Sequence, residues 1–359
     1  MHRLCDGIMP PMKALTYHGD KTVRLEQVPD PAILEPGDAI VRVEVCAVCG
    51  SDLHVYHGRE RGLDRGCVMG HEFVGEIVAL GSAPGGLSEG DRVLSPFTTN
   101  CGDCYFCRIG LTSRCVSGEL FGWVQEGRGL QGGQAEYVRV PLAGSTLVSI
   151  LDGVDDNAAL LLGDVFSTGW FCAEQAALQP GSVCAVVGCG PVGLCAVIAA
   201  GEMKAGRIFA LDRVPERLAL AERFGALAVN IEQDDPVAVV REATAGRGAD
   251  AVLEIVGSAA AHRVAMDLVR PGGTLSVVGV HSEDAFSFSP AEAYDKNLTY
   301  RVGRCPARRL ASELLPLVRR RNFDFAAILS HRLALDDGVE AYRIFDEKLD
   351  GCIKISLIP

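Results

Sequence analysis

The sequence predicts two domains of different fold class, an antiparallel barrel-like β domain and a doubly wound parallel α/β domain. The chain has 359 residues, which is long enough for two separate cores. Up to about residue 165, short β-type runs are broken by glycine and proline, as is typical of antiparallel β structure. Beyond that point, apolar strands alternate with amphipathic helices, which indicates a parallel sheet covered by helices.

The first region is expected to form the barrel-like domain. The tail from about residue 298 returns to mixed character and ends on a strand, so we expect it to rejoin this domain. Residues 1–12 are expected to be a loose extension without the apolar core of a signal peptide. The predicted domain limits are 1–165 with 299–359, and 166–298. The strands of the first domain are predicted over residues 13–17, 39–45, 74–80, 92–94, 135–140 and 352–357.

The second region is expected to form the doubly wound domain. Its apolar runs have the length of buried strands, and each is followed by a helical pattern with charged residues on one face. The strands are predicted over residues 183–187, 207–211, 228–231, 251–256 and 274–280, and the helices over 192–201, 215–224, after Pro236 and from Ala259.

Composition and charge limit the classes of partner. The net charge of -12 argues against a nucleic-acid partner, because phosphate backbones attract basic surfaces. No apolar run approaches the roughly 20 residues that span a bilayer, so no membrane partner is expected. Fourteen cysteines without an export signal indicate a reducing compartment, and we expect a cytoplasmic protein.

Four cysteines follow a C-x2-C-x2-C-x7-C spacing at Cys101, Cys104, Cys107 and Cys115. Short loops of this kind let four thiolates converge on one tetrahedral ion. Because all four ligands are sulfur, no coordination position stays open, and the pattern predicts a structural zinc. Disulfides are the alternative, and the absence of an export signal disfavours them.

A glycine-rich loop follows a predicted strand and opens a predicted helix. In this loop Gly188 permits a tight turn, Gly190 lets the backbone approach a pyrophosphate, and Gly193 lets helix and strand pack closely. Asp212 ends the next predicted strand and can accept the ribose hydroxyls, which favours NAD over NADP. NADP stays an alternative cofactor, because the guanidinium of the neighbouring Arg213 can hold a 2′-phosphate.

Three segments far apart in the sequence carry candidate metal ligands of mixed type. Residues 49–54, 70–72 and 163–169 supply a thiolate, an imidazole and a carboxylate. Each segment alone also has a structural interpretation, since a lone histidine is more often a hydrogen-bonded core residue. Three protein ligands with one open position are typical of a catalytic zinc.

Together these motifs resemble those of the zinc-dependent alcohol dehydrogenases of the medium-chain dehydrogenase/reductase family. The resemblance implies a chaperonin-10-like domain that carries two zinc ions, a Rossmann domain that binds NAD, and an active site in the cleft between them. It runs from about residue 13 to the end and rests on Cys49, Ser51 and His54, on Gly70-His71-Glu72, on the four-cysteine segment, and on residues 166–169 and 188–193.

The resemblance assigns roles to the candidate ligands. It implies Cys49, His71 and Asp164 as ligands of the catalytic zinc, and Glu72 as a neighbour of this zinc or an exchanging ligand. Many relatives have cysteine where this chain has Asp164, and a bacterial subgroup has aspartate there. The segment 129–137, which ends in Gly-Gly-Gln-Ala-Glu-Tyr, resembles the same subgroup.

Further residues near these ligands are also candidates for the site. Ser51 and His54 resemble the family's proton relay from the alcohol to solvent, and Asp52 is expected to be a partner of a ligand. Phe97 and Trp123 are candidates for the wall of the substrate pocket, with ordinary core packing as the alternative.

The dinucleotide also receives residues from the resemblance. Thr168 and Val192 would press the nicotinamide into place, Arg217 would reach the ribose or a phosphate, and Lys354 would contact a phosphate. Relatives often have a basic residue where this chain has Gly50, so one pyrophosphate contact is expected to be missing. The cofactor-binding set is Gly188, Gly190, Pro191, Val192, Gly193, Asp212, Arg213, Arg217 and Thr168.

The implied reaction is reversible hydride transfer between a primary or secondary alcohol and NAD. Polyols, amino alcohols such as threonine, and formaldehyde are alternative substrates within the family. A catalytically inactive NAD-binding structural protein is the alternative of another class. Because family members form dimers or tetramers, we expect a homo-oligomer and favour a tetramer.

Overall fold

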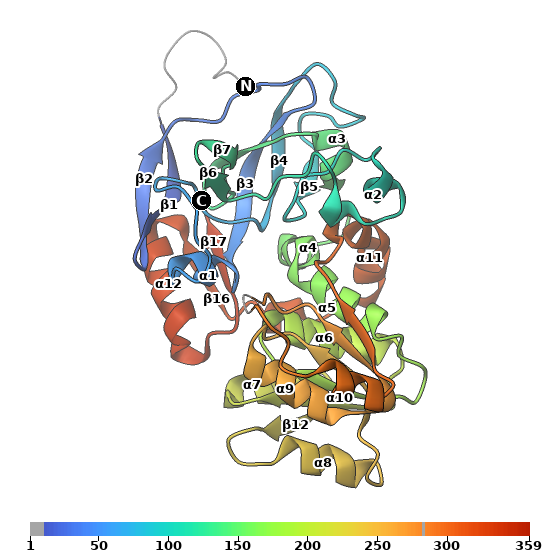
Figure 1. Cartoon of the computed structure of the whole chain (residues 1–359). Coiled ribbons are helices and arrows are strands. Elements are labelled where there is room, and N and C mark those ends of the chain that lie inside the picture. Colours follow the sequence, from blue (N-terminus) through green and yellow to red (C-terminus); the bar gives the residue numbers. More distant parts are fainter. Residues whose placement is uncertain (1–10, 282–283) are drawn as a thin grey trace. The chain divides into compact units, whose positions relative to one another are not determined.

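The computed structural model describes residues 11–281 and 284–359, which divide into two compact units (Figure 1). The first unit contains the described residues up to Asp164 together with Pro306–Pro359, and the second contains Val165–Cys305. Most of the expected N-terminal extension, residues 1–10, lies outside the described residues, and strand β1 (Met12–Gly19) begins directly after it. Among the described residues, no helix is both long and apolar enough to cross a membrane.

A seven-stranded sheet is the framework of the first unit, with the order β16-β17-β3-β4-β5-β9 and with β8 also paired to β3. The pairs are antiparallel except for β16 with β17, which is parallel. The C-terminal strand β17 pairs with β3, so the predicted return of the tail is confirmed. The strands are β3 (Ala39–Val48), β4 (Phe73–Leu80), β5 (Arg92–Leu94), β8 (Tyr137–Val140), β9 (Val148–Ser149), β16 (His331–Ala334) and β17 (Ile355–Ile358).

Two hairpins and several helices complete this unit. Its core contains the fully buried side chains of Leu15, Phe73, Ile77 and Phe121, which come from strands and loops far apart in the sequence. The hairpins are β1 with β2 (Thr22–Val28) and β6 (Trp123–Gln125) with β7 (Arg128–Leu130). The helices are α1 (Asp52–Tyr56), α2 (Tyr105–Arg108), α3 (Ala143–Thr146), α4 (Asp156–Gly163), α11 (Ala307–Arg321) and α12 (Gly338–Glu347).

A six-stranded parallel sheet with the order β12-β11-β10-β13-β14-β15 is the framework of the second unit. This confirms the doubly wound fold that the alternating pattern predicts. The strands are β10 (Val183–Val187), β11 (Arg207–Asp212), β12 (Leu227–Asn230), β13 (Ala249–Glu254), β14 (Val269–Val277) and β15 (Thr299–Val302). The helices are α5 (Val165–Gln175), α6 (Pro191–Glu202), α7 (Pro215–Arg223), α8 (Pro236–Ala243), α9 (Ala259–Leu268) and α10 (Pro290–Asp295).

The limit between the domains differs from the expected one at the C-terminal side. We expected the tail to leave the second domain at residue 299. The structure instead uses Thr299–Val302 as the sixth parallel strand, β15, so the second unit runs to Cys305. Three of the four residues of this short strand are exposed, because it lies at the edge of the sheet, and its apolar content is therefore too low to mark it in the sequence.

Candidate active site

The structure brings the predicted mixed ligands together. Cys49 follows the end of β3, and His71 and Glu72 come just before β4. Because β3 and β4 are antiparallel neighbours, with Cys46 opposite Phe73, these residues emerge at the same end of the pair. Asp164 is the C-cap of α4, and the ligand atoms of all four residues lie within 4.8 Å of one another.

The donor set of this buried cluster fits a zinc ion. The Cys49 Sγ lies 3.6 Å from Asp164 Oδ2, and the His71 Nε2 lies 3.4 Å from the same oxygen. A thiolate sulfur, an imidazole nitrogen and a carboxylate oxygen are the donors that zinc takes in proteins. All four residues are buried, so a charged group among them needs compensation by an opposite charge.

The pKa shifts of Cys49 and His71 show that the cluster has an excess of acidic groups. Burial raises the pKa of the Cys49 thiol, and the nearby Glu72 carboxylate raises it further. Although burial lowers the pKa of His71, the carboxylates of Asp52 and Asp164 raise it well above its ordinary value. Acidic groups therefore dominate the cluster, and a divalent cation would favour the thiolate and the neutral imidazole.

Asp52 has the partner that we expected for it. Its Oδ1 lies 3.4 Å from the His71 Nδ1, the ring nitrogen on the side away from Asp164. Its Oδ2 accepts the backbone N–H of Cys49 at 2.9 Å. One carboxylate thus contacts both the histidine and the backbone of the cysteine, which orients two of the candidate ligands.

Lys354 has a different partner from the phosphate that we expected. Its ammonium is buried, donates to Glu72 at 2.6 Å and to the carbonyl of Val48 at 3.1 Å. Burial lowers the pKa of Lys354, but the Glu72 carboxylate outweighs burial and holds the pKa above its ordinary value. Burial raises the pKa of Glu72 to about 7 against the opposing charge of Lys354. The signal available in the sequence was one lysine inside the apolar run 352–358.

The predicted relay residues lie on one short element. Ser51 is the N-cap of α1, and His54 lies three residues on, so the two side chains share a face of the helix. The Ser51 Oγ lies 3.3 Å from the His71 Nε2, beside the candidate ligands. The buried Nδ1 of His54 has no hydrogen-bond partner among the described residues, and burial lowers the pKa of this histidine. At neutral pH His54 is therefore uncharged and able to accept a proton.

The four predicted cysteines form a second cluster, in which each sulfur lies within 4.8 Å of the others. Backbone N–H groups point at the sulfurs: Cys101 N donates to Cys115 Sγ at 3.2 Å, and Cys104 N donates to Cys101 Sγ at 3.3 Å. Such N–H donors favour the thiolate, and the backbone N–H groups of Cys107 and Val116 lower the pKa of Cys104 to about 6. The cluster therefore fits a closed structural zinc with four sulfur ligands.

The glycine-rich loop has the predicted context, with β10 before it and α6 after it. Gly188 has φ of +94°, a conformation that favours glycine. A Cβ at Gly193 would lie 1.9 Å from the carbonyl oxygen of Gly188, so only glycine permits this approach of helix and loop. Gly190 is the N-cap of α6 and Pro191 its first residue, which leaves the first N–H groups of the helix available to an anion.

Asp212 lies at the end of β11, next to this loop. Its carboxylate accepts the backbone N–H of Cys189 at 2.7 Å and that of Arg213 at 2.8 Å, and Arg217 Nη1 lies 4.0 Å away. Asp212 thus ties the loop to the next strand and presents its charge there. The Arg213 side chain is exposed.

The structure also places the remaining predicted residues. Thr168 in α5 and Val192 in α6 are half-buried, and these two helices pack against each other. The ring of Phe97 meets that of His71 edge-on, with centroids 6.4 Å apart. Trp123 packs against the core of the first unit, as its alternative interpretation states. A Cβ at Gly50 would meet open space.

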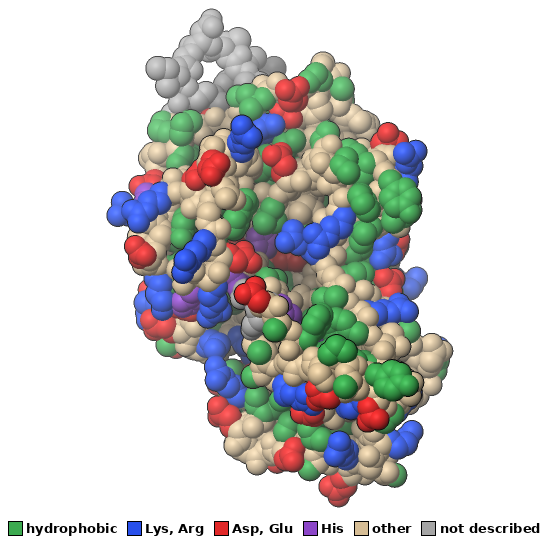
Figure 2. All heavy atoms as spheres, viewed as in Figure 1, with side chains coloured by type: hydrophobic (Ala, Val, Ile, Leu, Met, Phe, Trp, Pro, Cys, Tyr) green, Lys and Arg blue, Asp and Glu red, His purple; other side chains and the backbone are tan. Residues whose placement is uncertain are grey.

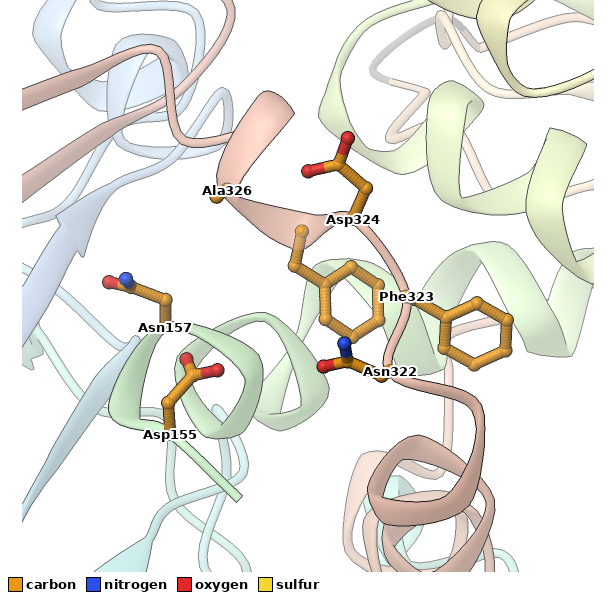
Figure 3. Close-up of a pocket in the computed structure, with 7 residues that line it drawn as sticks. Asp155, Asn157, Asn322, Phe323, Asp324 and Ala326 are labelled. Carbon is orange, nitrogen blue, oxygen red and sulfur yellow. The ribbon is translucent and has the colours of Figure 1, made fainter. Parts of the chain in front are cut away.

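A separate pocket of about 310 Å³ lies at the start of α4 (Figure 3). Its lining carries carboxylate, amide and phenyl groups but no thiol and no imidazole. None of the residues predicted for the site belongs to it. The lining residues are Asp155, Asn157, Asn322, Phe323, Asp324, Phe325 and Ala326.

Comparisons with known proteins match most of the chain. Residues 35–150 match the alcohol dehydrogenase GroES-like domain, and residues 191–320 match the zinc-binding dehydrogenase domain. The zinc-type alcohol dehydrogenase B of Aspergillus flavus is 41% identical over 343 residues, covering 93% of this chain and 79% of the relative. The crystal structure of alcohol dehydrogenase TADH from Thermus sp. ATN1 matches with a TM-score of 0.91 and 38% identity, covering 97% of this chain and 99% of the other. A zinc-binding dehydrogenase from Sinorhizobium meliloti 1021 bound to NADP matches with a TM-score of 0.81 and 26% identity, covering 97% and 99%.

Proposed function

Because the chain belongs to the zinc-dependent alcohol dehydrogenases of the medium-chain dehydrogenase/reductase family, we propose that it transfers hydride between a primary or secondary alcohol and NAD. The observation that carries this proposal is the buried cluster of Cys49, His71, Glu72 and Asp164, whose ligand atoms lie within 4.8 Å of one another. We assign Cys49, His71 and Asp164 as ligands of the catalytic zinc and the four cysteines as ligands of a structural zinc. When bound, the catalytic zinc lowers the pKa of an alcohol, and the nicotinamide accepts its hydride.

Side chains near the cluster orient the proposed ligands and move the proton of the alcohol. Asp52 holds the His71 ring so that its Nε2 faces the other ligands. Ser51 is placed beside that nitrogen to accept the proton of the alcohol, and the neutral His54 is placed one helical turn on to pass it to solvent. Lys354 stays charged and holds Glu72 as its ion partner, which leaves Glu72 as a neighbour of the metal or an exchanging ligand.

The cofactor is proposed to be NAD. The Gly188–Gly193 loop and the start of α6 would receive the pyrophosphate, and Asp212 would accept the ribose hydroxyls and repel a 2′-phosphate. Arg213 is the feature that would favour NADP, and the NADP-bound relative shows that the fold accepts that cofactor. The ratio of kcat/KM with NAD to that with NADP decides between them.

Assembly and compartment complete the proposal. Strand β15 leaves its outer edge unpaired within the described chain, and Val302 on it is exposed, which supports a homo-oligomer, with a tetramer favoured. The fourteen cysteines of the sequence support a reducing, cytoplasmic compartment, because thiols persist there. Light scattering measures the mass of the assembly.

The test is a substrate panel of primary alcohols, secondary alcohols, polyols, threonine and formaldehyde, with NADH absorbance as the readout. The proposal expects turnover of at least one alcohol in the zinc-loaded protein and loss of that turnover on removal of the metal. Tight NAD binding without turnover of any member of the panel would contradict it and would support an inactive NAD-binding protein.

A further inference from the structure

We propose that Gln134 and Tyr342 are positioning residues for the metal ligand His71, acting through Asp52. This inference rests on the proposed zinc ligands and adds residues that the family resemblance did not assign. Gln134 belongs to the Gly-Gly-Gln-Ala-Glu-Tyr motif, and Tyr342 belongs to α12 near the C-terminus. Both side chains are buried, so their polar atoms must find partners inside the protein.

A continuous chain of contacts connects these residues to His71. The Tyr342 hydroxyl donates to Gln134 Oε1 at 2.9 Å. The Gln134 Nε2 donates to Asp52 Oδ2 at 3.1 Å and to the carbonyl of Ala47 at 3.0 Å. The other oxygen of Asp52 lies 3.4 Å from the His71 Nδ1.

The donor and the acceptor of each hydrogen bond made by Gln134 follow from the chemistry of its partners. The ionised carboxylate of Asp52 and the carbonyl of Ala47 only accept, so the amide nitrogen of Gln134 must face them and its oxygen must face away. That oxygen then accepts the single hydroxyl proton of Tyr342. The other oxygen of Asp52 faces the His71 Nδ1, and a proton on Nδ1 would leave the lone pair on Nε2 for the metal.

The backbone at Gly70 is shaped around Gln134. Gly70 has φ of +92°, and a Cβ there would lie 2.4 Å from Cγ of Gln134. The backbone N–H of Gln134 also donates to the carbonyl of Met69 at 2.9 Å. The residue before His71 is thus packed directly against Gln134, so the amide side chain contacts the histidine segment from the backbone side and through Asp52.

A purely structural role is the competing explanation, because any buried amide needs partners. The two explanations differ in which metal they affect. Loss of a positioning contact weakens the metal at Cys49, His71 and Asp164 and leaves the four-cysteine metal unchanged. General destabilisation of the unit weakens both sites, since both belong to the first unit.

The test measures zinc retention at the two sites of the full-length protein by competition with a chromophoric chelator. Gln134→Leu keeps the size of the side chain and removes both amide donors, and we expect the zinc affinity at His71 to fall about 10-fold. Tyr342→Phe removes only the hydroxyl, and we expect a loss of about 3-fold that disappears in the Gln134→Leu background. Tyr56→Phe is the matched control, because its ring packs 5.6 Å from that of Tyr342 but its hydroxyl is outside the chain of bonds.

The outcomes separate this inference from the proposed function. Unchanged affinity in both variants would overturn the inference alone, as would equal losses at the two zinc sites. If Gln134→Leu failed to fold, the affinity of Tyr342→Phe would decide, because it removes one oxygen atom. A wild-type protein with no metal at Cys49, His71 and Asp164 would overturn both the proposed function and the inference.

Discussion

The four-cysteine cluster takes all of its sulfur atoms from residues 101–115, whereas the Cys49 cluster joins residues up to 115 positions apart. The cysteines of the first are partly exposed and are contacted by backbone N–H groups. The side chains of the second are buried and are contacted by charged groups, including Asp52 and Lys354. A local loop suffices for a closed structural site, whereas a site with mixed donors needs the assembled fold to place each donor.

This difference predicts that a substitution in one cluster removes the metal from that cluster and leaves the other cluster unchanged. The largest expected effect is that of Asp164→Ala, which removes one donor of the buried cluster only. We expect kcat/KM to fall on the order of 10⁴-fold, about 5 kcal/mol of transition-state stabilisation, with zinc lost from this cluster and retained by the four cysteines. Metal analysis with steady-state kinetics measures both. Asp164→Cys is the control, since it restores an anionic ligand, and equal loss of both zinc ions in Asp164→Ala would contradict the separation.

The ion pair of Glu72 and Lys354 tests whether the buried cluster depends on charges that the exposed cluster lacks. Lys354→Met leaves Glu72 without its cation in a site that water does not reach. We expect the free energy of unfolding to fall by about 4 kcal/mol, measured by urea denaturation. The double variant Glu72→Gln/Lys354→Met removes both charges and should recover most of this loss. If Lys354→Met were as stable as the wild type, Glu72 would not depend on Lys354 as its ion partner.

Removal of a ligand from the exposed cluster should affect stability and leave the chemistry intact. Cys107→Ser takes one thiolate from the four, and we expect Tm to fall by about 6 °C because a structural zinc contributes to folding. At temperatures well below that transition, kcat/KM should stay within about twofold of the wild-type value. Calorimetry and kinetics on the same sample measure the two quantities, and a loss of activity without a fall in Tm would contradict the assignment of this cluster as structural.

The smallest expected effect concerns the proton path that we propose for the buried cluster alone. Burial lowers the pKa of His54 below its ordinary value of 6.5, so the proton-accepting form dominates above that lowered pKa. The contribution of His54 to kcat/KM is therefore complete above pH 6.5 and is lost as the pH falls through the lowered value. We expect His54→Gln to reduce kcat/KM about 10-fold at neutral pH, less than the roughly 10² of a direct base, because water replaces part of the relay.

The pH–rate profile supplies the control for this effect. His54→Gln should lose the acidic limb, whereas His18→Gln, which changes a histidine paired with Glu26 on the β1–β2 hairpin, should keep it. An unchanged acidic limb in His54→Gln would exclude His54 from the proton path.

The sequence predicted the features that depend on local spacing. Residues close together in the sequence form each of these features: the four cysteines, the Gly188–Gly193 loop and the strand-helix alternation of the second unit. The proposed ligands Cys49, His71 and Asp164 were inferred from the order of motifs that resemble a family, and the structure brings these residues together.

The features that the sequence did not reveal depend on contacts between distant residues. The pair of Lys354 with Glu72 joins positions 282 apart, and that of Tyr342 with Gln134 joins positions 208 apart. The hydrophobic periodicity of the sequence does not predict such long-range pairs. Only the presence of a charged or amide side chain within a buried segment indicates them. Strand β15 was missed for a different reason, since an exposed edge strand needs few apolar residues.

Exposed ion pairs of the surface differ in their energetic weight from the buried charges of the candidate site. On the face drawn in Figure 2, acidic and basic side chains are interspersed. Exposed ion pairs join residues near in the sequence, such as Arg343 with Glu340, and residues far apart, such as Lys13 with Asp336. Exposed pairs of this kind contribute at most about 1 kcal/mol each to stability.

X-ray diffraction from crystals of the zinc-loaded full-length protein, recorded at the zinc absorption edge, tests the central claim most directly. The account predicts an anomalous peak within about 2.4 Å of Cys49 Sγ, His71 Nε2 and a carboxylate oxygen of Asp164, together with a separate peak among the four cysteines. A peak among the four cysteines with none shared by Cys49, His71 and Asp164 would contradict it.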